Sequence, residues 1–290
     1  MEKKETVAVY IDGGNTYQRL KTLGIPEKSA RLDYSAFIAH LVGDRKLISK
    51  RYYVGIVKNV DNTEKGEKMV KGQQKFLDGL RNEGFEVKAG RIMYDDGRIR
   101  EKGVDVKLSL DVVVGAVDDW YDTAIIISSD TDLIPAIKYI RSAKKKNVEY
   151  IGFGANPSIG MIKESSTPRV FSKTDMVQFQ SKTLKFRSHL ADLILGGKKT
   201  VTWRLFDDKG LKVGDILNFQ VSETEKDFAK AVITEVKEKK LGDIKEEDYN
   251  GHEKFESQKG MLNHYKEYYG DKVTLETLVK IINFDLKKKP

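Results

Sequence analysis

The chain has 290 residues, of which 39% are hydrophobic and 33% charged, and a formal net charge of +8 that favours a polyanionic partner. No segment approaches the roughly 18 apolar residues of a membrane span. The absence of cysteine excludes disulfides, thiolate nucleophiles and Cys-type zinc or iron–sulfur sites. The four histidines are too scattered for a helical zinc site, so a bound metal would be a hard cation held by carboxylates. The N-terminus lacks the apolar stretch of a secretory signal, so a cytoplasmic protein is expected.

The first 180 residues alternate between strand and helix patterns. Strands are expected at residues 6–11, 47–57, 85–93, 124–128 and 148–153. Helices are expected at about residues 15–23, 67–81, 104–120 and 133–143. This alternation predicts an α/β domain with a mostly parallel sheet.

The pattern changes after residue 180, where turns rather than helices separate most of the strands. Strands are expected at residues 183–186, 200–206, 215–221, 229–236 and 279–286, with helices near 188–195 and 257–269. This is typical of a small, barrel-like β-rich module. We therefore expect two domains, residues 1–180 and 181–290.

Aspartates follow the ends of two of the predicted strands. Asp12 ends the first strand, and Asp130 and Asp132 follow the strand at 124–128. Asp105 lies in the first turn of the preceding helix. Because ligands bind outside the carboxyl ends of parallel strands, and because crossover connections are right-handed, we expect these side chains to converge at one rim of the sheet.

Carboxylates gathered at one rim repel one another unless a divalent cation neutralises them, so Mg²⁺ or Mn²⁺ is expected there. Such an ion activates water and offsets charge on a phosphate, which favours phosphodiester hydrolysis. Asn15 would orient an aspartate or the scissile phosphate. The alternative is that each aspartate only caps a helix or forms a turn, which explains one of them better than all four. Asp111, about 240° further round the helix than Asp105, is a second-rank candidate.

Three motifs in this order carry a resemblance to a known family. They are Tyr10-Ile11-Asp12-Gly13-Gly14-Asn15, then Lys102-Gly103-Val104-Asp105-Val106 with Asp111, then Ser128-Ser129-Asp130-Thr131-Asp132-Leu133. Together they resemble the NYN domain of the PIN-like nuclease superfamily, in its LabA-like branch, over about residues 5–180. The resemblance implies an RNA-directed, metal-dependent endoribonuclease whose site carboxylates are Asp12, Asp105, Asp130 and Asp132, with Asn15 beside them. The family often has Ser-Gly-Asp where this chain has Ser128-Ser129-Asp130.

Basic residues near the rim and in the second module are candidate RNA contacts. Those beside the rim, which would hold a backbone phosphate, are Arg98, Arg100 and Lys102, although a solvated loop face explains them equally well. In the second module, basic and aromatic side chains interleave in a way that suits single-stranded RNA. The candidates there are Lys185, Arg187, Lys198, Lys199, Thr202, Trp203 and Arg204. For Trp203 the alternative is a place in the core.

The second module also resembles a family. Its motifs are Gly-Lys-Lys-Thr-x-Thr-x-Arg ending at Arg204, Leu211-Lys212-Val213-Gly214-Asp215, and the acidic stretch at residues 242–248. They resemble an ASCH domain over residues 181–290, which implies a PUA-like β-barrel that binds RNA. Some ASCH members are similar to nucleoside amidohydrolases that use a lysine, a threonine and a glutamate. The matching residues here are Lys199, Thr202 and Glu253.

The leading hypothesis is a ribonuclease whose first module cuts RNA and whose second module positions it. This hypothesis requires Mg²⁺ or Mn²⁺ as the cofactor. No membrane is expected among the partners. Two alternatives remain open. One is an RNA-binding regulator without catalysis, and the other is hydrolysis of an acylated nucleoside by the ASCH-like module.

Overall fold

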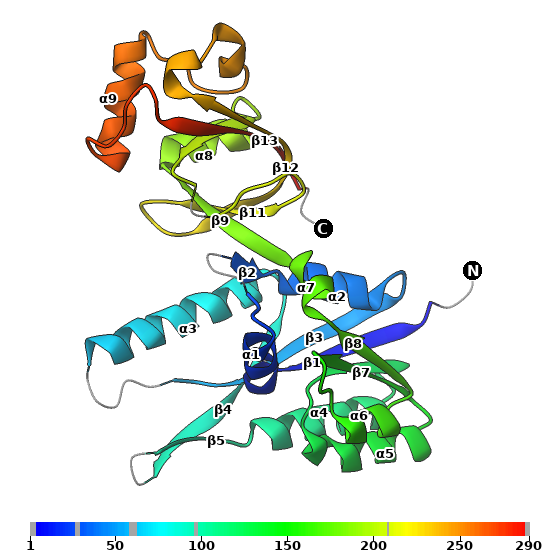
Figure 1. The fold of residues 1–290 in the computed structure, drawn as a ribbon. Helices are drawn as coiled ribbons and strands as arrows, with labels where there is room; N and C mark the ends of the chain where they lie inside the picture. The colour runs from blue at the N-terminus through cyan, green and yellow to red at the C-terminus, as the bar shows by residue number, and fades with distance from the viewer. Residues whose placement is uncertain (1–3, 27–29, 58–62, 96–97, 208, 288–290) are drawn as a thin grey trace. The chain divides into compact units, whose positions relative to one another are not determined.

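The computed structural model describes residues 4–26, 30–57, 63–95, 98–207 and 209–287, with the backbone alone for residues 30 and 91–102. The chain divides into two compact units (Figure 1). The first contains residues up to Ile25 together with Tyr34–Val177, and the second contains Pro26–Asp33 and the chain from Gln178 onward. The expected boundary after residue 180 lies close to the main division. The segment Pro26–Asp33, however, belongs to the second unit, which no periodic pattern indicates.

A seven-stranded sheet with the order β5-β4-β3-β1-β6-β7-β8 forms the centre of the first unit. All neighbours pair in parallel except β4 and β5, which form an antiparallel pair. The strands are β1 (Thr6–Asp12), β3 (Lys46–Gly55), β4 (Glu86–Asp95), β5 (Arg98–Lys102), β6 (Thr123–Ile127), β7 (Asn147–Phe153) and β8 (Thr167–Phe171). The α/β fold with a mostly parallel sheet is confirmed, and β5 and β8 are strands that the sequence analysis did not expect.

Helices cover both faces of this sheet (Figure 1). Its helices are α1 (Gly13–Thr22), α2 (Tyr34–Val42), α3 (Glu64–Asn82), α4 (Val104–Val117), α5 (Ile134–Ser142), α6 (Ile159–Glu164) and α7 (Lys173–Val177), with a 3₁₀ turn at Thr131–Leu133. Neighbouring residues of β3 face opposite layers. The Tyr52 ring packs on Tyr34 of α2 at a centroid distance of 5.5 Å, whereas Tyr53 lies in the core beneath α4. In the ranges that the structure describes, no helix is both long and apolar enough to cross a membrane.

The second unit is built on a six-stranded mixed sheet with the order β10-β13-β12-β11-β9-β2, which curves strongly (Figure 1). Its elements are β2 (Ala30–Leu32), β9 (Gln180–Phe186), α8 (Ser188–Leu195), β10 (Val201–Leu205), β11 (Ile216–Val221), β12 (Asp227–Lys240), α9 (Gln258–Tyr269) and β13 (Leu278–Leu286), with 3₁₀ turns at Leu241–Asp243 and Glu246–Tyr249. Strands β9 and β11 are parallel and the other pairs antiparallel. Successive residues of β13 face two separate hydrophobic clusters. Ile282 belongs to the cluster that contains Phe219, and Ile281 belongs to the cluster that contains Trp203.

A segment from the N-terminal part of the chain completes this second sheet. Strand β2 pairs antiparallel with the first residues of β9, and the Asp33 amide donates to the Phe179 carbonyl at 2.6 Å. The Asp33 carboxylate, only 4% exposed, lies 2.9 Å from the Lys230 ammonium, and Arg31 pairs with Asp227 at 2.8 Å. Strand β2 and Asp33 therefore form an integral edge of the second unit.

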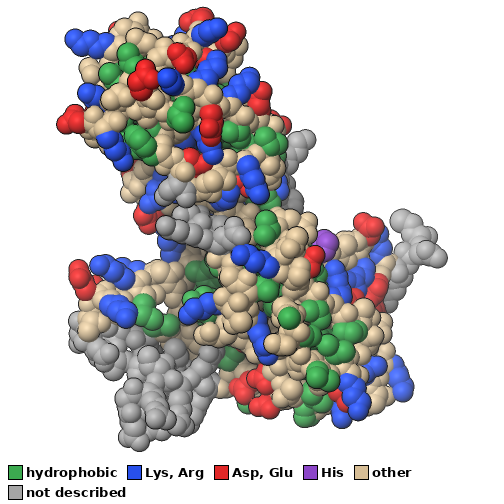
Figure 2. Space-filling view, in the orientation of Figure 1, with side chains coloured by type: hydrophobic (Ala, Val, Ile, Leu, Met, Phe, Trp, Pro, Cys, Tyr) green, Lys and Arg blue, Asp and Glu red, His purple; other side chains and the backbone are tan. Residues whose placement is uncertain are grey.

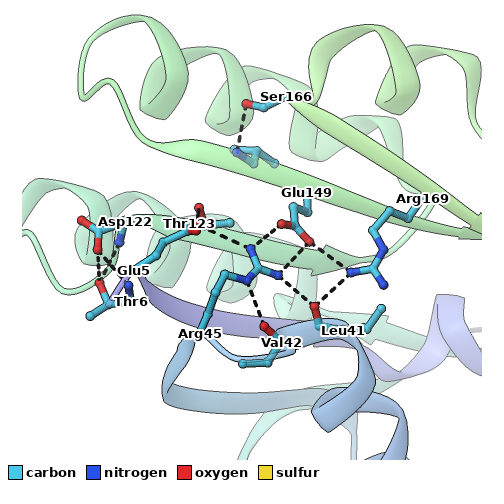
Figure 3. A network of polar contacts seen from close by, with 11 residues as sticks. Glu5, Thr6, Leu41, Val42, Arg45, Asp122, Thr123, Glu149, Ser166 and Arg169 are labelled. Atoms are coloured by element: carbon cyan, nitrogen blue, oxygen red, sulfur yellow. Dashed lines mark hydrogen bonds and ion pairs between the residues drawn. The ribbon is translucent and has the colours of Figure 1, made fainter. Parts of the chain in front are cut away.

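Paired charges close the amino-terminal edge of the first unit's sheet (Figure 3). Glu149 accepts hydrogen bonds from Arg45 Nη1 at 2.5 Å and from Arg169 Nη1 at 3.5 Å, and both arginines also donate to the Leu41 carbonyl. Nearby, Asp122 accepts hydrogen bonds from the amide and the hydroxyl of Thr6 at the start of β1. Because each of these carboxylates has its own donors, this edge is a structural one.

Candidate active site at the carboxyl edge of the sheet

The last residue of β1 is also the N-cap of α1. Asp12 has extended backbone angles (φ −74°, ψ 101°), and its Oδ1 accepts the amide of Asn15 at 3.0 Å. At the next position only glycine fits, because a Cβ on Gly13 would lie 2.5 Å from Tyr52 Cε1 and 2.7 Å from the Tyr53 carbonyl oxygen. The helix therefore starts in direct contact with β3, and this holds the Asp12 carboxylate at the carboxyl edge of the sheet.

The end of β6 is bonded to the end of β1, its parallel neighbour. Ser128 Oγ donates to Asp12 Oδ2 at 2.9 Å and accepts the amide of Asp130 at 3.1 Å. The Ser129 amide donates to Asn15 Oδ1 at 2.9 Å. The structure thus brings together Asp12, Asn15 and Asp130, three of the candidates chosen from the sequence.

The two serines that make these links were not among the candidates. Ser129 Oγ also lies 3.0 Å from the Tyr150 hydroxyl on β7, which in turn accepts the amide of Ser158. The serine that stands where the NYN-like pattern often has glycine therefore ties the loop to a third strand. The available signal was a pair of small hydroxyl residues directly between a buried strand and an aspartate, a position suited to bonding nearby backbone groups.

The other two predicted carboxylates are exposed near the same edge. Asp130 Oδ1 accepts the amide of Asp132, so Asp130 also caps the 3₁₀ turn. Asp105 lies in the first turn of α4, where the preceding residue, Val104, shares a core cluster with Leu133 of the 3₁₀ turn. In the described part of the chain, no three Asp, Glu or His side chains are close enough to hold one metal ion. The expected convergence of four carboxylates on one metal ion is thus not seen: Asp105 and Asp132 are exposed, and of the four only Asp12 and Asp130 are linked to one another, through Ser128.

The charge of the Asp12 carboxylate is not matched by a cation among the side chains that the structure describes. Burial raises the pKa of Asp12 and the Asp130 carboxylate raises it too, while hydrogen bonds from Asn15 and Ser128 lower it. Among the described side chains, no Lys or Arg forms an ion pair with Asp12 or Asp130. Glu149 at the opposite edge, in contrast, has two arginines. Two adjoining carboxylates without a cation are an arrangement that a bound divalent ion would stabilise.

Asp111 faces the sheet and not the rim. Its Oδ2 accepts a hydrogen bond of 2.7 Å from the Tyr53 hydroxyl and lies 3.8 Å from Arg51 Nη1. Tyr53 is the register partner of Asp12 in the β1–β3 ladder. Asp111 therefore joins α4 to β3 beside the register position of Asp12, and a part in the chemistry of the site stays a second-rank prediction.

The three basic candidates beside the rim, Arg98, Arg100 and Lys102, lie on β5, and their side chains are outside the described residues. Their part in phosphate binding stays a prediction.

In the second unit, Lys199 and Glu253 form an ion pair. Lys199 is only 3% exposed, and the His252 ring lies against the pair with Nδ1 3.3 Å from Glu253 Oε2. Burial lowers the pKa of Lys199 although Glu253 raises it, and burial together with the Lys199 charge lowers the pKa of His252 to about 4. Thr202, the third residue of the ASCH-like set, is buried on β10.

Some of the residues of the second unit that were expected to contact RNA are exposed, and others are buried. Lys185, Arg187 and Lys198 are exposed, and Arg204 is partly buried. Trp203 is 3% exposed and stacks on His252 with a centroid distance of 4.2 Å and an interplanar angle of 17°. It is therefore a core residue and offers no free face to a base, because its side chain packs under the aromatic cluster around α9.

The NYN domain family matches residues 6–175, which contain the whole carboxyl edge just described. The chain belongs to the NYN domain family. NYN domains are part of the PIN-like nuclease superfamily, so this membership indicates a nuclease-like, RNA-related function.

Solved structures similar to this NYN protein include a protein of unknown function from Vibrio parahaemolyticus, with 23% identity over 59% of this chain and 97% of that chain and a TM-score of 0.46. An ASCH domain from Lactobacillus crispatus shares 18% identity over 36% of this chain and 77% of that chain, with a TM-score of 0.30. An ASCH protein from Zymomonas mobilis shares 13% identity over 37% and 66% of the two chains, with a TM-score of 0.28. No curated protein matches the chain.

Proposed function

We propose that this NYN protein is a metal-dependent endoribonuclease that hydrolyses RNA phosphodiesters at the Asp12–Asp130 edge, with the second unit binding and positioning the RNA. One observation carries the proposal. Two carboxylates at adjoining strand ends share the Ser128 hydroxyl and, among the described side chains, have no cationic partner. The RNA-related character of the family and the net charge of +8 support RNA as the substrate.

The residues at this edge fit Mg²⁺ or Mn²⁺. Both are hard cations that prefer oxygen ligands, and Mg²⁺ usually takes one or two carboxylates while keeping several waters. Asp12 and Asp130 would hold the ion, with Asp105 and Asp132 as exposed carboxylates near the same edge. When bound, it would lower the pKa of a coordinated water and offset negative charge on the reacting phosphate.

The remaining polar groups of the site act through position. Asn15 Oδ1 is used by the Ser129 amide, so its amide nitrogen is the atom left to donate to a phosphate oxygen. Ser128 fixes the Asp12 carboxylate and the Asp130 backbone through one hydroxyl. The close contact of Gly13 with Tyr52 and Tyr53 of β3 holds the start of α1 against the sheet.

The test is cleavage of a labelled RNA panel, single-stranded and hairpin, in Mg²⁺ or Mn²⁺. Asp12→Asn and Asp130→Asn should each lower the cleavage rate by at least about 100-fold, with RNA affinity unchanged or slightly higher because a repulsive charge is removed. Asp118→Asn, the same change at the exposed far end of α4, is the matched control and should cut normally. Cleavage that persists in both variants and in excess chelator would contradict the proposal. RNA binding without any cleavage would favour the regulator alternative.

A second candidate function is hydrolysis of an acylated nucleoside in the second unit. The buried Lys199–Glu253 pair favours it, because burial makes Lys199 easier to deprotonate for activating a nucleophile such as Thr202. Lys199→Met, which keeps most of the side-chain volume, should abolish deacylation of an N-acetylated nucleoside, while exposed Lys259→Met should not. No turnover of such substrates by the wild-type protein would discard this candidate.

A further inference from the structure

One face of α4 carries a stripe of apolar side chains that the fold leaves uncovered. Val106, Leu110 and Val117 are 66%, 58% and 47% exposed, and the partly buried Val113 completes the series. At about 100° per residue, these four side chains lie within roughly 60° of one another around the helix. Leu108 and its neighbours on another face of α4 pack in the core instead. The helix is therefore apolar on two faces, one buried against the sheet and one open to solvent.

A continuous stripe differs from the single apolar side chains that are normal on a protein surface. Within this sector of α4, all of whose side chains the structure describes, every residue is apolar. Tyr139 on α5, the helix that packs beside α4, is also 43% exposed. Figure 2 shows hydrophobic side chains gathered on the first unit, on the side where α4, α5 and α6 lie, whereas basic and acidic side chains are interspersed over the second unit. A contiguous apolar surface of this kind is typical of a contact with another protein.

The spacing within the stripe suits a second copy of the same helix. The four residues are separated by steps of four, three and four, which is the alternation found in the apolar seam between two packed helices. The same steps are read in both directions along α4. An antiparallel copy therefore sets Val106 against Val117 and Leu110 against Val113, so that each apolar residue meets another. Antiparallel packing also places helix ends of opposite partial charge side by side.

The charges beside the stripe match this arrangement. Lys107 near the start of α4 and Asp118 at its end lie on the same flank of the stripe, about 20° apart around the helix. A two-fold axis across the middle of the stripe brings Lys107 of one copy beside Asp118 of the second copy. The Lys107 ammonium donates to the Ala89 carbonyl at 3.3 Å and has further N–H groups for this contact. Because both side chains are exposed, the pair contributes little affinity and mainly favours the antiparallel direction.

We propose that this stripe is the contact of a symmetric homodimer, in which α4 packs antiparallel on α4 of a second copy, with the two-fold axis between Leu110 and Val113. Two-fold dimers are the commonest closed assemblies of soluble proteins. The contact uses residues of the first unit alone and does not depend on the proposed nuclease function. Because α4 has 14 residues and spans only about 21 Å, the contact is smaller than that of an obligate dimer, and we expect a Kd in the micromolar range.

The first test is sedimentation of the full chain without RNA, at protein concentrations from about 1 to 100 μM. The wild-type chain should show a monomer–dimer equilibrium in this range. Leu110→Lys places a charge in the middle of the seam and should weaken dimerisation by at least about 100-fold. Leu195→Lys is the matched control, because Leu195 at the end of α8 is 57% exposed, and it should dimerise like the wild type. A wild-type chain that stays monomeric, or a dimer that Leu110→Lys leaves intact, would overturn the inference.

The second test measures the direction of packing and uses the absence of cysteine from the chain. Leu110→Cys lies beside its own copy near the axis and should form a disulfide-linked dimer on oxidation with diamide. Val106→Cys alone should not, because its copy lies about 16 Å away along the antiparallel pair, but the double variant with Val117→Cys should. A link that Val106→Cys forms by itself as readily as the double variant would overturn the antiparallel arrangement.

The outcomes of these tests are separate from those of the cleavage assay. A monomeric chain would leave metal-dependent cleavage in place. Absence of cleavage by the wild-type chain would leave a measured dimer, and its loss in Leu110→Lys, in place.

Discussion

The hydroxyl of Ser128 lies 2.9 Å from Asp12 Oδ2 and donates to it, and the same hydroxyl accepts the amide of Asp130. One buried side chain thus sets the relative position of the two acids at the ends of β1 and β6. The site depends on this link because neither acid is held by an ion pair among the described residues.

Replacing this hydroxyl should reduce catalysis more than stability. Ser128→Ala is expected to lower the cleavage rate by about 10- to 100-fold, since small displacements of catalytic groups are costly. The free energy of unfolding should fall by only about 1 kcal/mol, the typical contribution of one hydrogen bond. Parallel cleavage and urea-unfolding measurements check this. Ser142→Ala, at an exposed position on α5 where the hydroxyl bonds its own helix, is the control, and an equal loss of activity there would contradict the account.

The start of α1 should not tolerate a side chain at residue 13. Gly13→Ala places a methyl group 2.5 Å from Tyr52 Cε1, so α1 must move away from β3. We expect a loss of about 2–3 kcal/mol in the free energy of unfolding, as for overpacked cores, together with loss of cleavage. Gly72→Ala in α3, where nothing lies within 4 Å of the added Cβ, should instead stabilise by about 0.5–1 kcal/mol. Chemical denaturation of the two variants distinguishes these outcomes.

The N-terminal segment that supplies β2 should matter for the second unit. Asp33→Asn removes the negative charge that lies 2.9 Å from the Lys230 ammonium and should destabilise that unit by about 1–3 kcal/mol, the cost of losing a hydrogen bond between charged groups. Hydrogen exchange should then accelerate in β9 and β12, not in β1 or β6. Exposed Asp44→Asn serves as the control. Faster exchange confined to the first unit would show that the segment belongs there.

The second unit should lose stability as the pH falls from about 6.5 to 4. Burial and the Lys199 charge lower the pKa of His252 to about 4, so the unfolded chain binds a proton in this window that the folded chain does not. The loss can reach about 3 kcal/mol, since a tenfold difference in proton affinity corresponds to about 1.4 kcal/mol. The lowered pKa of Glu253 makes its own contribution to the pH dependence of stability fall at lower pH. His264 is unchanged in the His252→Gln variant, so it does not affect the comparison with the wild-type protein. His252→Gln should flatten the stability profile measured by thermal unfolding, and an unchanged profile would contradict this assignment.

Local sequence patterns were sufficient for the elements that carry the acids. The apolar, β-branched sequences of β1 and β6 are typical of buried strands. Because the carboxyl ends of parallel strands meet at one edge of the sheet, Asp12 and Asp130 are then expected at that edge. The same reasoning located Asn15. Ser128 and Ser129 were missed because their role depends on which strand lies next to β6, which periodicity does not reveal.

What the sequence analysis missed depends on contacts between distant residues. Strand β2 has only three residues and takes its structure from β9, about 150 positions further along the chain. Trp203 was open to two interpretations because an aromatic ring among basic residues suits stacking on RNA bases. Its packing against His252 and α9 shows that it is a core residue. Asp111 becomes a structural partner only because α4 crosses β3 above Tyr53.

The most direct test of the central claim is Mn²⁺ binding to the full chain, measured by calorimetry for the wild-type protein, Asp12→Asn, Asp130→Asn and the control Asp118→Asn. We expect one Mn²⁺ site in the wild-type and control proteins and at least tenfold weaker binding in each of the other two variants. Equal Mn²⁺ affinity in all four proteins, or none in any, would contradict it.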